Sequence, residues 1–315
     1  MRVLKQKWSR KRWGVKLEGP RRLQNFRFAD DLLLVGRSLG QAKGMLEDLI
    51  HEAKAFGLEV HMDKTKVLWN GVGQATAETR LDIDGKQFEI LGSDSSTMYL
   101  GRMLCLRNDI THDVELKKRM AKGWAKFAVY REELTNPHYS LKQRMQIFTS
   151  VIQPCILYGC VSWTMTAQRT AKLQTTQRRM MRKILDTKRR RQTERDGSEV
   201  LETYVDWIRR ATRRVEEVMS QYGVPDWVEE SRRRKFRWAG KVFRRTDGRW
   251  TTQVLKSPST GSRRSGRPIN RWSLTLDKFF DEVSEAMGTN VDWKTIATDE
   301  DSWHAYEDQF VSFLA

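Results

Sequence analysis

The sequence predicts an α+β protein, in which antiparallel hairpins and one helix precede a longer series of helices. In residues 1–105, short apolar runs alternate with turn residues, which is typical of hairpins. Beyond residue 105 the apolar residues recur at three- and four-residue spacing, which predicts helices. Helices that follow a sheet indicate an α+β architecture, with the helices forming a separate layer or subdomain.

The first predicted element is a hairpin. The apolar runs Leu23–Phe28 and Leu32–Val35 flank the polar pair Asp30 and Asp31, as in two strands joined by a short turn. A helix is expected next, because Ser38 is a favourable N-cap and apolar residues at helical spacing follow it. Further strands are expected at Leu58–Val60, Val67–Trp69, Phe88–Leu91 and Met98–Leu104, with a loop at Gly71–Arg80.

The rest of the chain is expected to be helical. Thr111, Ser140 and Thr166 are N-cap residues ahead of apolar residues at helical spacing, and Pro154 interrupts the second of these helices. Later helices are expected at Ser198–Tyr222, from Pro225 to about Phe243, and at Arg271–Met287, with a Ser-, Gly- and Arg-rich linker at Ser257–Arg267.

The net charge indicates a polyanionic partner. The chain has 315 residues, and its 58 Lys and Arg against 40 Asp and Glu give a net charge of +18. The positive charge is concentrated in segments 178–191 and 231–271, whereas segment 272–315 is acidic. Nucleic acid is therefore the favoured partner, ahead of an anionic membrane surface. The acidic end either folds onto the basic part or keeps the chain soluble.

Cysteine content and apolar runs exclude several other classes. Three cysteines, Cys105, Cys155 and Cys160, are too few for a disulfide scaffold or a Cys-rich zinc module. No run approaches the roughly 18 apolar residues of a membrane span, and the basic N-terminus lacks the apolar stretch of a secretory signal. We therefore expect an intracellular protein without a transmembrane segment, and the basic runs Lys188–Arg191 and Arg232–Lys235 indicate the nucleus.

The pair Asp30 and Asp31 is the strongest candidate for chemistry. Adjacent carboxylates repel each other unless cations lie between them. Mg²⁺ prefers carboxylate oxygens and leaves part of its coordination shell for a phosphate substrate. Two such ions at a rigid hairpin tip would suit phosphoryl transfer. The alternative is an ordinary solvated turn, in which Asp is common.

Four short motifs occur in the order found in one known family. The stretch Phe28–Asp31 between two apolar strands resembles the catalytic hairpin of reverse transcriptases, in particular those of non-LTR (LINE-type) retrotransposons. The next three are similar to an apolar strand ending in Lys-Thr, to the primer-grip hairpin and to a Tyr-Gly…Trp element after the palm, and they lie at Gly57–Lys66, Tyr99–Gly101 and Leu157–Trp163. The resemblance covers about residues 23–190.

The resemblance implies a role for each motif. Asp30 and Asp31 would be catalytic residues that bind two Mg²⁺ ions in the palm. Lys64 would protonate the departing pyrophosphate, unless it is an ordinary surface lysine. The primer grip, which would hold the primer's 3′ end unless it is a plain strand and turn, comprises Tyr99, Leu100 and Gly101. The parent reaction would be RNA-directed DNA synthesis from dNTPs.

The chain also departs from the family. The family has a third carboxylate on an earlier palm strand, yet only 27 residues precede Phe28. His61 stands where the family usually has Asn, and Val161 where it often has Glu. We therefore expect a chain truncated upstream of the Ala-Asp-Asp hairpin and inactive as a polymerase on its own. The alternative is a non-catalytic RNA- or DNA-binding protein derived from a retrotransposon.

The resemblance divides the chain into part of a palm (1–105), a helical thumb-like region (106–190) and a basic helical region with an acidic end (191–315). We expect these regions to bind RNA and DNA as a template–primer duplex, and we expect no membrane partner. Arg pairs with phosphates, while core packing is favoured over base stacking for Trp238 and Trp272. The candidate nucleic-acid-binding residues are the clustered cations Arg178, Arg179, Arg182, Lys188, Arg189, Arg190, Arg191, Arg232, Arg233, Arg234, Lys235, Arg237, Arg263, Arg264, Arg267 and Arg271.

Overall fold

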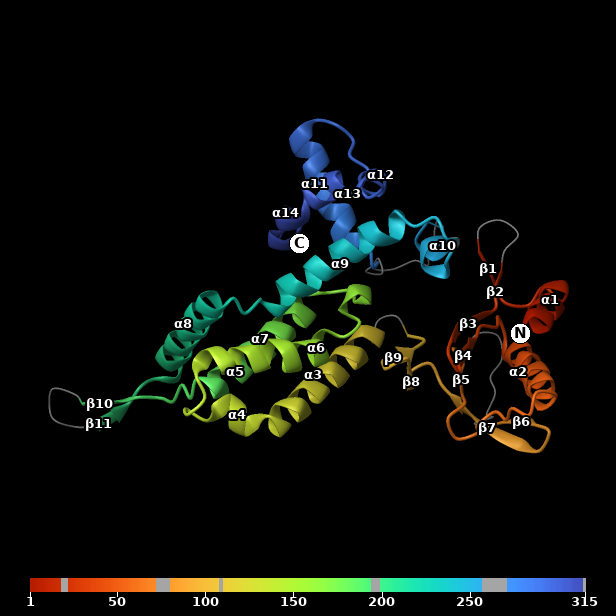
Figure 1. Ribbon diagram of the computed structural model, residues 1–315, viewed down its shortest axis with the longest axis horizontal. Coiled ribbons are helices and arrows are strands. Elements are labelled where there is room, and N and C mark those ends of the chain that lie inside the picture. Colours follow the sequence, from red (N-terminus) through yellow and green to blue (C-terminus); the bar gives the residue numbers. More distant parts are fainter. Residues whose placement is uncertain (18–21, 72–79, 108–109, 194–198, 257–270, 314–315) are drawn as a thin grey trace. The chain divides into compact units, whose positions relative to one another are not determined.

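The protein combines helices with small sheets, and it is therefore mixed α+β (Figure 1). The structure is a computed structural model that describes residues 1–17, 22–71, 80–107, 110–193, 199–256 and 271–313. The chain divides into two units. Unit 1 comprises Met1–Glu115 and Asp247–Ile269, and unit 2 comprises Leu116–Thr246 and Asn270–Ala315.

Unit 1 contains most of the strands. Its helices are α1 (Arg2–Arg10), α2 (Leu39–Lys54) and α10 (Trp250–Lys256), and α3 (Thr111–Val129) begins in it. Its strands are β1 (Val15–Lys16), β2 (Arg22–Leu23), β3 (Asn25–Phe28), β4 (Asp31–Leu34), β5 (Lys66–Leu68), β6 (Arg80–Ile83), β7 (Lys86–Leu91), β8 (Ser96–Tyr99) and β9 (Arg102–Cys105). Three antiparallel pairs form, β1–β2, β3–β4 and β8–β9, while β7 lies between antiparallel β6 and parallel β5.

The core of unit 1 lies on both sides of α2. Leu46 and Ile50 of this helix pack with side chains of β6 and β7, among which Phe88 is fully buried. Burying a side chain of that size stabilises the fold by about 1.5–3 kcal/mol. A second cluster joins α1 to α2 and consists of Leu4, Trp8 and Met45.

The structure confirms the predicted first hairpin and the helix after it. The hydroxyl of Ser38 accepts a backbone N–H of the first turn of α2, at 3.2 Å. The predicted strand at Leu58–Val60 is wrong, because the N–H of Leu58 donates to the carbonyl of Ala53 and closes the helix instead. Gly57 between them is left-handed, with φ of +68°, as expected at the end of a helix. Neither α1 nor β6 was predicted.

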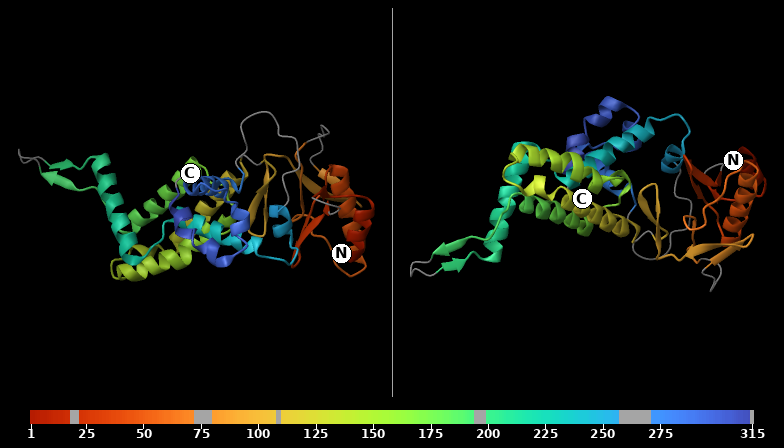
Figure 2. Two further views of the ribbon diagram at one scale, coloured as in Figure 1. Left: turned by 90° about the horizontal axis from the view of Figure 1, so that it is seen from above. Right: turned by 60° about the horizontal axis from the view of Figure 1, so that its bottom comes forward.

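The described part of unit 2 is helical apart from one hairpin. After the part of α3 that belongs to it, its helices are α4 (Arg131–Thr135), α5 (Leu141–Ile147), the π-helical turn η1 (Phe148–Ile152), α6 (Gln153–Leu157), the 3₁₀ turn η2 (Cys160–Ser162), α7 (Ala167–Ile184), α8 (Tyr204–Tyr222), α9 (Trp227–Phe243), α11 (Leu274–Met287), α12 (Trp293–Ile296), α13 (Glu300–His304) and α14 (Glu307–Ser312). The hairpin pairs β10 (Arg191–Thr193) with β11 (Glu199–Leu201) and extends away from α8 in both views of Figure 2. The helix predicted to begin at Ser198 therefore begins later.

The helix starts predicted at Ser140 and Thr166 are confirmed. Each side chain accepts a backbone N–H of the turn that follows, and Ser140 forms a reciprocal capping box with Gln143. Pro154 lies in the first turn of α6, directly after the π-helical turn η1. Because proline has no N–H to donate, the α-helical hydrogen-bond ladder cannot continue unchanged through it. The predicted interruption is therefore a local change of helix type.

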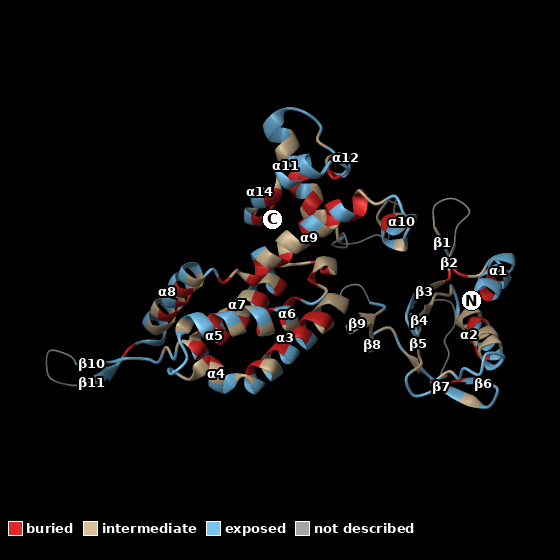
Figure 3. Ribbon diagram, in the orientation of Figure 1, coloured by how far each residue is buried: buried red, intermediate tan, exposed pale blue. Residues whose placement is uncertain are grey.

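Helix packing produces the core of unit 2. The stacked rings of Phe148 and Trp227 have centroids 5.4 Å apart and are both fully buried. Figure 3 shows buried positions along α3, α5 and α7 and exposed positions along β10 and β11. By length and composition alone, Leu141–Ser162 could cross a membrane. Its residues Phe148 and Ile152 belong to this core, and the core helix of a soluble protein passes the same test.

Candidate functional site

The paired carboxylates lie at the tip of the β3–β4 hairpin. Phe28 is opposite Asp31 in the register, so Ala29 and Asp30 form a two-residue turn. Ala29 has φ of +50°, the left-handed conformation that short hairpin turns require. Asp30 and Asp31 are exposed. The apolar strands on either side therefore hold both carboxylates at the surface, as the sequence predicted.

This pair supplies only part of a metal site. Mg²⁺ is often held by one or two carboxylates together with waters and substrate phosphates. Within the described ranges of the chain, no group of three or more His, Cys, Asp or Glu side chains could hold a metal ion. Asp30 and Asp31 therefore fit Mg²⁺ only in a site whose other ligands are phosphate oxygens, waters or a further carboxylate.

Tyr99 brings a second hairpin into electrostatic range of the first. It lies opposite Arg102 in the β8–β9 register, and the turn residues Leu100 and Gly101 have φ of +49° and +76°. Burial raises the pKa of the Tyr99 hydroxyl, and the negative charge of Asp31 raises this pKa further. Nothing in the described part of the chain hydrogen-bonds to the buried Tyr99 Oη. The phenol is therefore a protonated donor within reach of the Asp31 charge.

Lys64 is not joined to this pair of hairpins. It is exposed on the turn between α2 and β5, where the N–H and the Oγ1 hydroxyl of Thr65 both donate to the His61 carbonyl, at 3.1 and 2.8 Å. Among the described residues, Lys64 makes no hydrogen bond or ion pair with Asp30 or Asp31. Its role as a general acid stays a prediction.

The basic residues of α7 and β10 remain accessible to a ligand. Arg178 pairs with Glu216 and Arg191 pairs with Glu199, both at 3.2 Å and both at the surface. Exposed pairs of this kind contribute about 0–1 kcal/mol, so a phosphate can compete for the arginines. Arg179 lies over a tryptophan ring, 5.7 Å from its centroid. The other exposed or half-buried candidates here are Arg182, Lys188, Arg189 and Arg190.

The basic cluster on α9 is engaged by the acidic end of the chain. Arg237 donates to the Glu307 carboxylate through Nε and Nη2, at 2.8 and 2.6 Å, and Arg233 lies 3.3 Å from the same carboxylate. Arg234 pairs with Glu230 of its own helix at 2.6 Å. Of the two alternatives that the sequence left open, the acidic end therefore folds onto the basic part.

Lys235 of the same cluster is buried. It is 6% exposed, its ammonium lies 4.9 Å from the centre of the Trp272 ring, and burial lowers its pKa to about 8. Trp272 also packs edge-on against Trp238 and donates from Nε1 to the Val161 carbonyl at 2.7 Å. Both tryptophans thus make packing contacts, as predicted. Arg232 donates to a backbone carbonyl of the acidic end at 3.2 Å.

The last candidates lie largely in a part of the chain about which the structure gives no description. Arg263, Arg264 and Arg267, and with them the expected linker at Ser257–Arg267, fall outside the described residues. Arg271 is described and exposed. Nucleic-acid binding by these four arginines stays a prediction.

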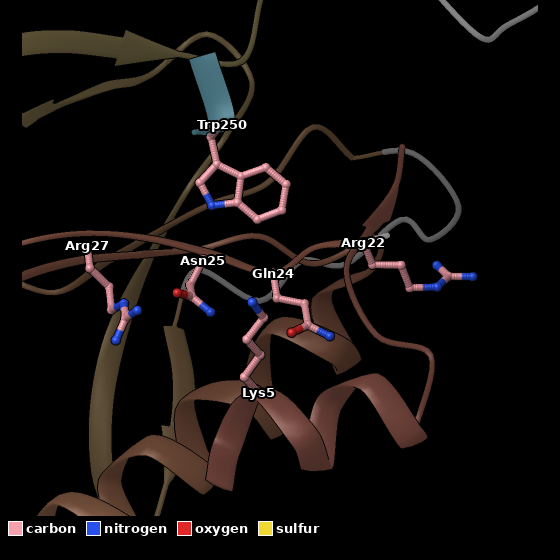
Figure 4. A pocket seen from close by; sticks show the side chains of 6 residues that line it. All are labelled: Lys5, Arg22, Gln24, Asn25, Arg27 and Trp250. Atoms are coloured by element: carbon pink, nitrogen blue, oxygen red, sulfur yellow. The ribbon is translucent and has the colours of Figure 1, made fainter. Parts of the chain in front are cut away.

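A cavity in unit 1 joins residues that no sequence pattern had connected. It has a volume of about 180 Å³, and its walls come from α1, the β2–β3 segment and the start of α10 (Figure 4). The residues that line it are Lys5, Arg22, Gln24, Asn25, Arg27 and Trp250. Trp250 is far in sequence from the other residues that line the cavity, so no residue spacing could predict this site. The local feature that could have pointed to it is the basic and aromatic pair Arg249 and Trp250.

Comparison with known proteins gives the origin of the chain. It aligns at 32% identity over 295 residues with a transposon-derived protein, and the alignment covers 90% of this chain and 95% of that relative. The chain therefore belongs to this family of transposon-derived proteins. The relative is the uncharacterized protein F52C9.6 of Caenorhabditis elegans. No protein-family model and no solved structure matches the chain.

Proposed function

We propose that this transposon-derived chain is a reverse-transcriptase-like protein that binds a template–primer duplex, with Asp30 and Asp31 contributing ligands for Mg²⁺ at the primer end. The observation that carries the proposal is the geometry of the β3–β4 hairpin, whose two-residue turn holds Asp30 and Asp31 exposed at its tip. The β8–β9 hairpin supports it, because burial and, to a smaller extent, the charge of Asp31 raise the pKa of Tyr99. The resemblance to reverse transcriptases implies metal binding for the first hairpin and primer binding for the second. A metal-binding carboxylate close to a primer-holding residue is what such a site requires.

The chemistry of the two hairpins supports this proposal. Exposed carboxylates can share a Mg²⁺ ion with a phosphate, and a bound Mg²⁺ would supply stabilisation of the negative charge that develops in phosphoryl transfer. Tyr99, whose hydroxyl is buried, precedes the turn residues Leu100 and Gly101 of the second hairpin, the segment that would lie against a primer. Asp30 and Asp31 alone do not complete a two-metal centre, so the proposal for this chain is binding at the primer end.

A non-catalytic RNA- or DNA-binding protein is the second candidate. It is favoured because the described residues contain no third metal-ligating side chain beside the carboxylate pair. It also needs only the surface cations, of which Arg178 and Arg179 on α7 lie on an accessible helix. The two candidates differ in whether Mg²⁺ changes the affinity for nucleic acid through Asp30 and Asp31.

Fluorescence anisotropy with a labelled RNA–DNA template–primer duplex, in Mg²⁺ and in a chelator, tests the proposal. Mg²⁺ is expected to tighten binding by the wild-type protein, and Asp30→Asn and Asp31→Asn are expected to remove that increment. Their affinity in the chelator is expected to stay at least as high as that of the wild type. Asp84→Asn is the matched control, since Asp84 is also exposed at a two-residue turn, between β6 and β7, and should keep the increment.

Two outcomes would contradict parts of the proposal. A Mg²⁺ increment that survives in both aspartate variants would remove the metal assignment and leave the second candidate. Salt dependence tests the binding itself, because a protein that contacts six to ten phosphates loses about 10³–10⁵-fold in affinity between about 50 and 200 mM salt. Binding that is weak and insensitive to salt would rule out both candidates.

A further inference from the structure

The cavity of unit 1 has walls of mixed chemistry. Figure 4 shows Lys5 extending from α1 toward the ring of Trp250, with Asn25 and Gln24 on either side of the lysine and the two arginines farther out. Phe26 meets the Trp250 ring nearly at right angles, at 71° and 6.2 Å between centroids. A contact at this angle holds the indole in place and leaves at least one of its two faces uncovered by Phe26.

The charged residues of the cavity have no acidic partner. Arg22 donates from Nη1 to the Gly14 carbonyl at 3.1 Å. Lys5 and Arg27 are exposed and form no ion pair within the described residues, and no carboxylate lines the cavity. Positive charge that is not balanced nearby attracts an anion, and Arg in particular binds phosphate through paired donors.

Gln24 lines the cavity with a polar side chain that has one unsatisfied hydrogen-bonding atom. Its side chain is 2% exposed, and its amide nitrogen donates to the hydroxyl of Ser9 and to the carbonyl of Trp13, at 3.2 and 3.3 Å. Its Oε1 is buried without a hydrogen-bond partner among the described residues. Such an oxygen costs free energy unless a donor reaches it. A ligand with an N–H or O–H group would satisfy it once the Gln24 side chain turns toward the cavity.

The size of the cavity limits the ligand. Pockets for drug-sized molecules have volumes of about 300–1,000 Å³, so a cavity of about 180 Å³ accommodates one aromatic base and not a larger molecule. An anion alone would not use the Trp250 face, and an apolar ligand would not use Lys5 and Arg27. A ring that carries hydrogen-bonding groups and an attached phosphate uses all three features.

We infer that this cavity binds a single nucleotide of a single-stranded nucleic acid. The base stacks on Trp250, its polar edge meets Gln24 and Asn25, and the phosphates on either side contact Lys5 and Arg27. Base–aromatic stacking of this kind is typical of single-strand binding. The inference relies on the proposed function only for the class of ligand, because the cavity is separate from the carboxylate pair in its lining residues.

The test uses a fluorescein-labelled single-stranded uridine oligonucleotide and the full chain. Trp250→Ala should weaken binding about 5- to 100-fold, and Trp250→Phe should retain most of the affinity, since it keeps an aromatic face. Lys5→Gln and Arg27→Gln should each weaken binding and reduce the salt slope by about 0.7. Arg10→Gln is the matched control, because it removes the same charge from α1 at a position that does not line the cavity.

A crosslinking experiment locates the strand directly. The same oligonucleotide with one thiouridine should crosslink to peptides containing Trp250 or residues 22–27, and the crosslink should disappear in Trp250→Ala. Unchanged affinity in Trp250→Ala, Lys5→Gln and Arg27→Gln, or crosslinks only elsewhere, would overturn the inference. The proposed function fails separately, when Mg²⁺ has no effect on duplex binding while single-strand binding still depends on Trp250.

Discussion

At the tip of the β3–β4 hairpin, Ala29 is held in a conformation that L-amino acids avoid. Its φ is +50°, and the left-handed region costs a residue with a Cβ atom about 1–2 kcal/mol. Strain of this kind is commonly retained beside functional residues, which is the role proposed for Asp30 and Asp31. The strain fixes the direction in which the two carboxylates leave the turn.

Ala29→Gly should therefore stabilise unit 1. Glycine removes the left-handed penalty but adds about 0.4–1 kcal/mol of unfolded-state entropy, which leaves a net gain of up to about 1.6 kcal/mol. The thermal transition of the full chain should rise by about 1–3 °C in calorimetry. Ala42→Gly in α2 is the control and should lower the transition, because Ala42 lies in a helix. A lower unfolding temperature for Ala29→Gly than for the wild type would show that Ala29 is not strained.

Lys235 is a charge buried at a cost to stability. Its pKa is about 8 in the folded protein against 10.5 for a free side chain, because burial disfavours the ammonium form more than Asp277 supports it. Below pH 8 both the folded and the unfolded state are protonated, and the full penalty is present. Between about pH 8 and 10.5 the folded state loses the proton first, so this residue makes stability rise with pH.

Lys235→Met should stabilise unit 2 at neutral pH. The pKa difference corresponds to a destabilisation of the folded state by about 3 kcal/mol. The substitution removes this cost but also removes the attraction of the ammonium to the Trp272 ring, which is worth about 0.5–2 kcal/mol. Urea unfolding at pH 7 should show the gain, and the rise in stability above pH 8 should flatten. Lys278→Met, at an exposed position of α11, should change neither. A variant that is less stable than wild type at pH 7 would show that the ring contact outweighs burial.

At the scale of single elements, Glu202 connects the β10–β11 hairpin to α8. Its carboxylate accepts from Arg210 Nε and Nη2 at 2.9 and 2.7 Å and from the backbone N–H of Arg190 at 3.1 Å. Hydrogen bonds from Arg210 lower the pKa of Glu202 to about 2. The Glu202 carboxylate makes its full contribution to the free energy of unfolding above its ordinary pKa of 4.5. That contribution is lost as the pH falls toward 2.

Glu202→Gln should loosen the hairpin without unfolding α8. Loss of the charge-assisted bonds frees Arg210 and exposes the base of β10 and β11 to opening. Amide hydrogen exchange in Arg191–Thr193 and Glu199–Leu201 should become faster, while exchange in the middle of α8 stays unchanged. Glu199→Gln is the control, because its pair with Arg191 is exposed and weak. Equal exchange in both variants would mean that Glu202 does not anchor the hairpin.

Elements whose signals are local were predictable, and those that depend on distant partners were not. The β3–β4 turn and the helix caps at Ser38, Ser140 and Thr166 follow from neighbouring residues, and the structure contains them. α1 was missed because its buried face, Leu4 and Trp8, reads as two isolated apolar residues in a basic stretch. The β10–β11 hairpin was missed because the exposed strands carry no alternation of buried residues.

The candidate site shows the same limit. The positions of Asp30 and Asp31 at a hairpin tip could be predicted, because a turn is set by adjacent residues. That Tyr99 lies within range of Asp31, or that Lys235 is buried, depends on contacts between residues far apart in sequence. The basic run in the sequence predicted a positively charged surface on α9. It could not show that Glu307, far away in the sequence, neutralises part of that charge.

For the molecule as a whole, the acidic end occupies arginines of α9 that the proposed nucleic-acid ligand would need. Glu307 is 7% exposed, and burial raises its pKa. The hydrogen bonds and charge of Arg237, together with the interaction with His304, outweigh burial and hold the pKa below its usual value. The carboxylate is therefore ionised at neutral pH and keeps Arg237 and Arg233 occupied. A phosphate that binds these arginines must first displace it.

Glu307→Gln should increase affinity for a duplex and lower stability. Two arginines are released, so the salt slope of binding should steepen by up to about two, while the loss of a buried charged partner lowers the unfolding temperature. Anisotropy over a salt series and calorimetry measure the two effects. Glu282→Gln removes an exposed charge from α11 and should have little effect on either. An unchanged salt slope in Glu307→Gln would show that the α9 arginines do not meet phosphate.

The return of the chain to unit 1 has a consequence for its synthesis. Trp250 packs against Phe26, yet about 135 residues separate Glu115 from Trp250. At a translation rate of about 5–20 residues per second, the ribosome needs about 7–27 s to make that stretch. The Phe148 core of unit 2, which ends at Val228, is synthesised in the meantime. The strands and helices of unit 1 that are made first therefore lack Trp250 for this period, during which the cavity of unit 1 is incomplete.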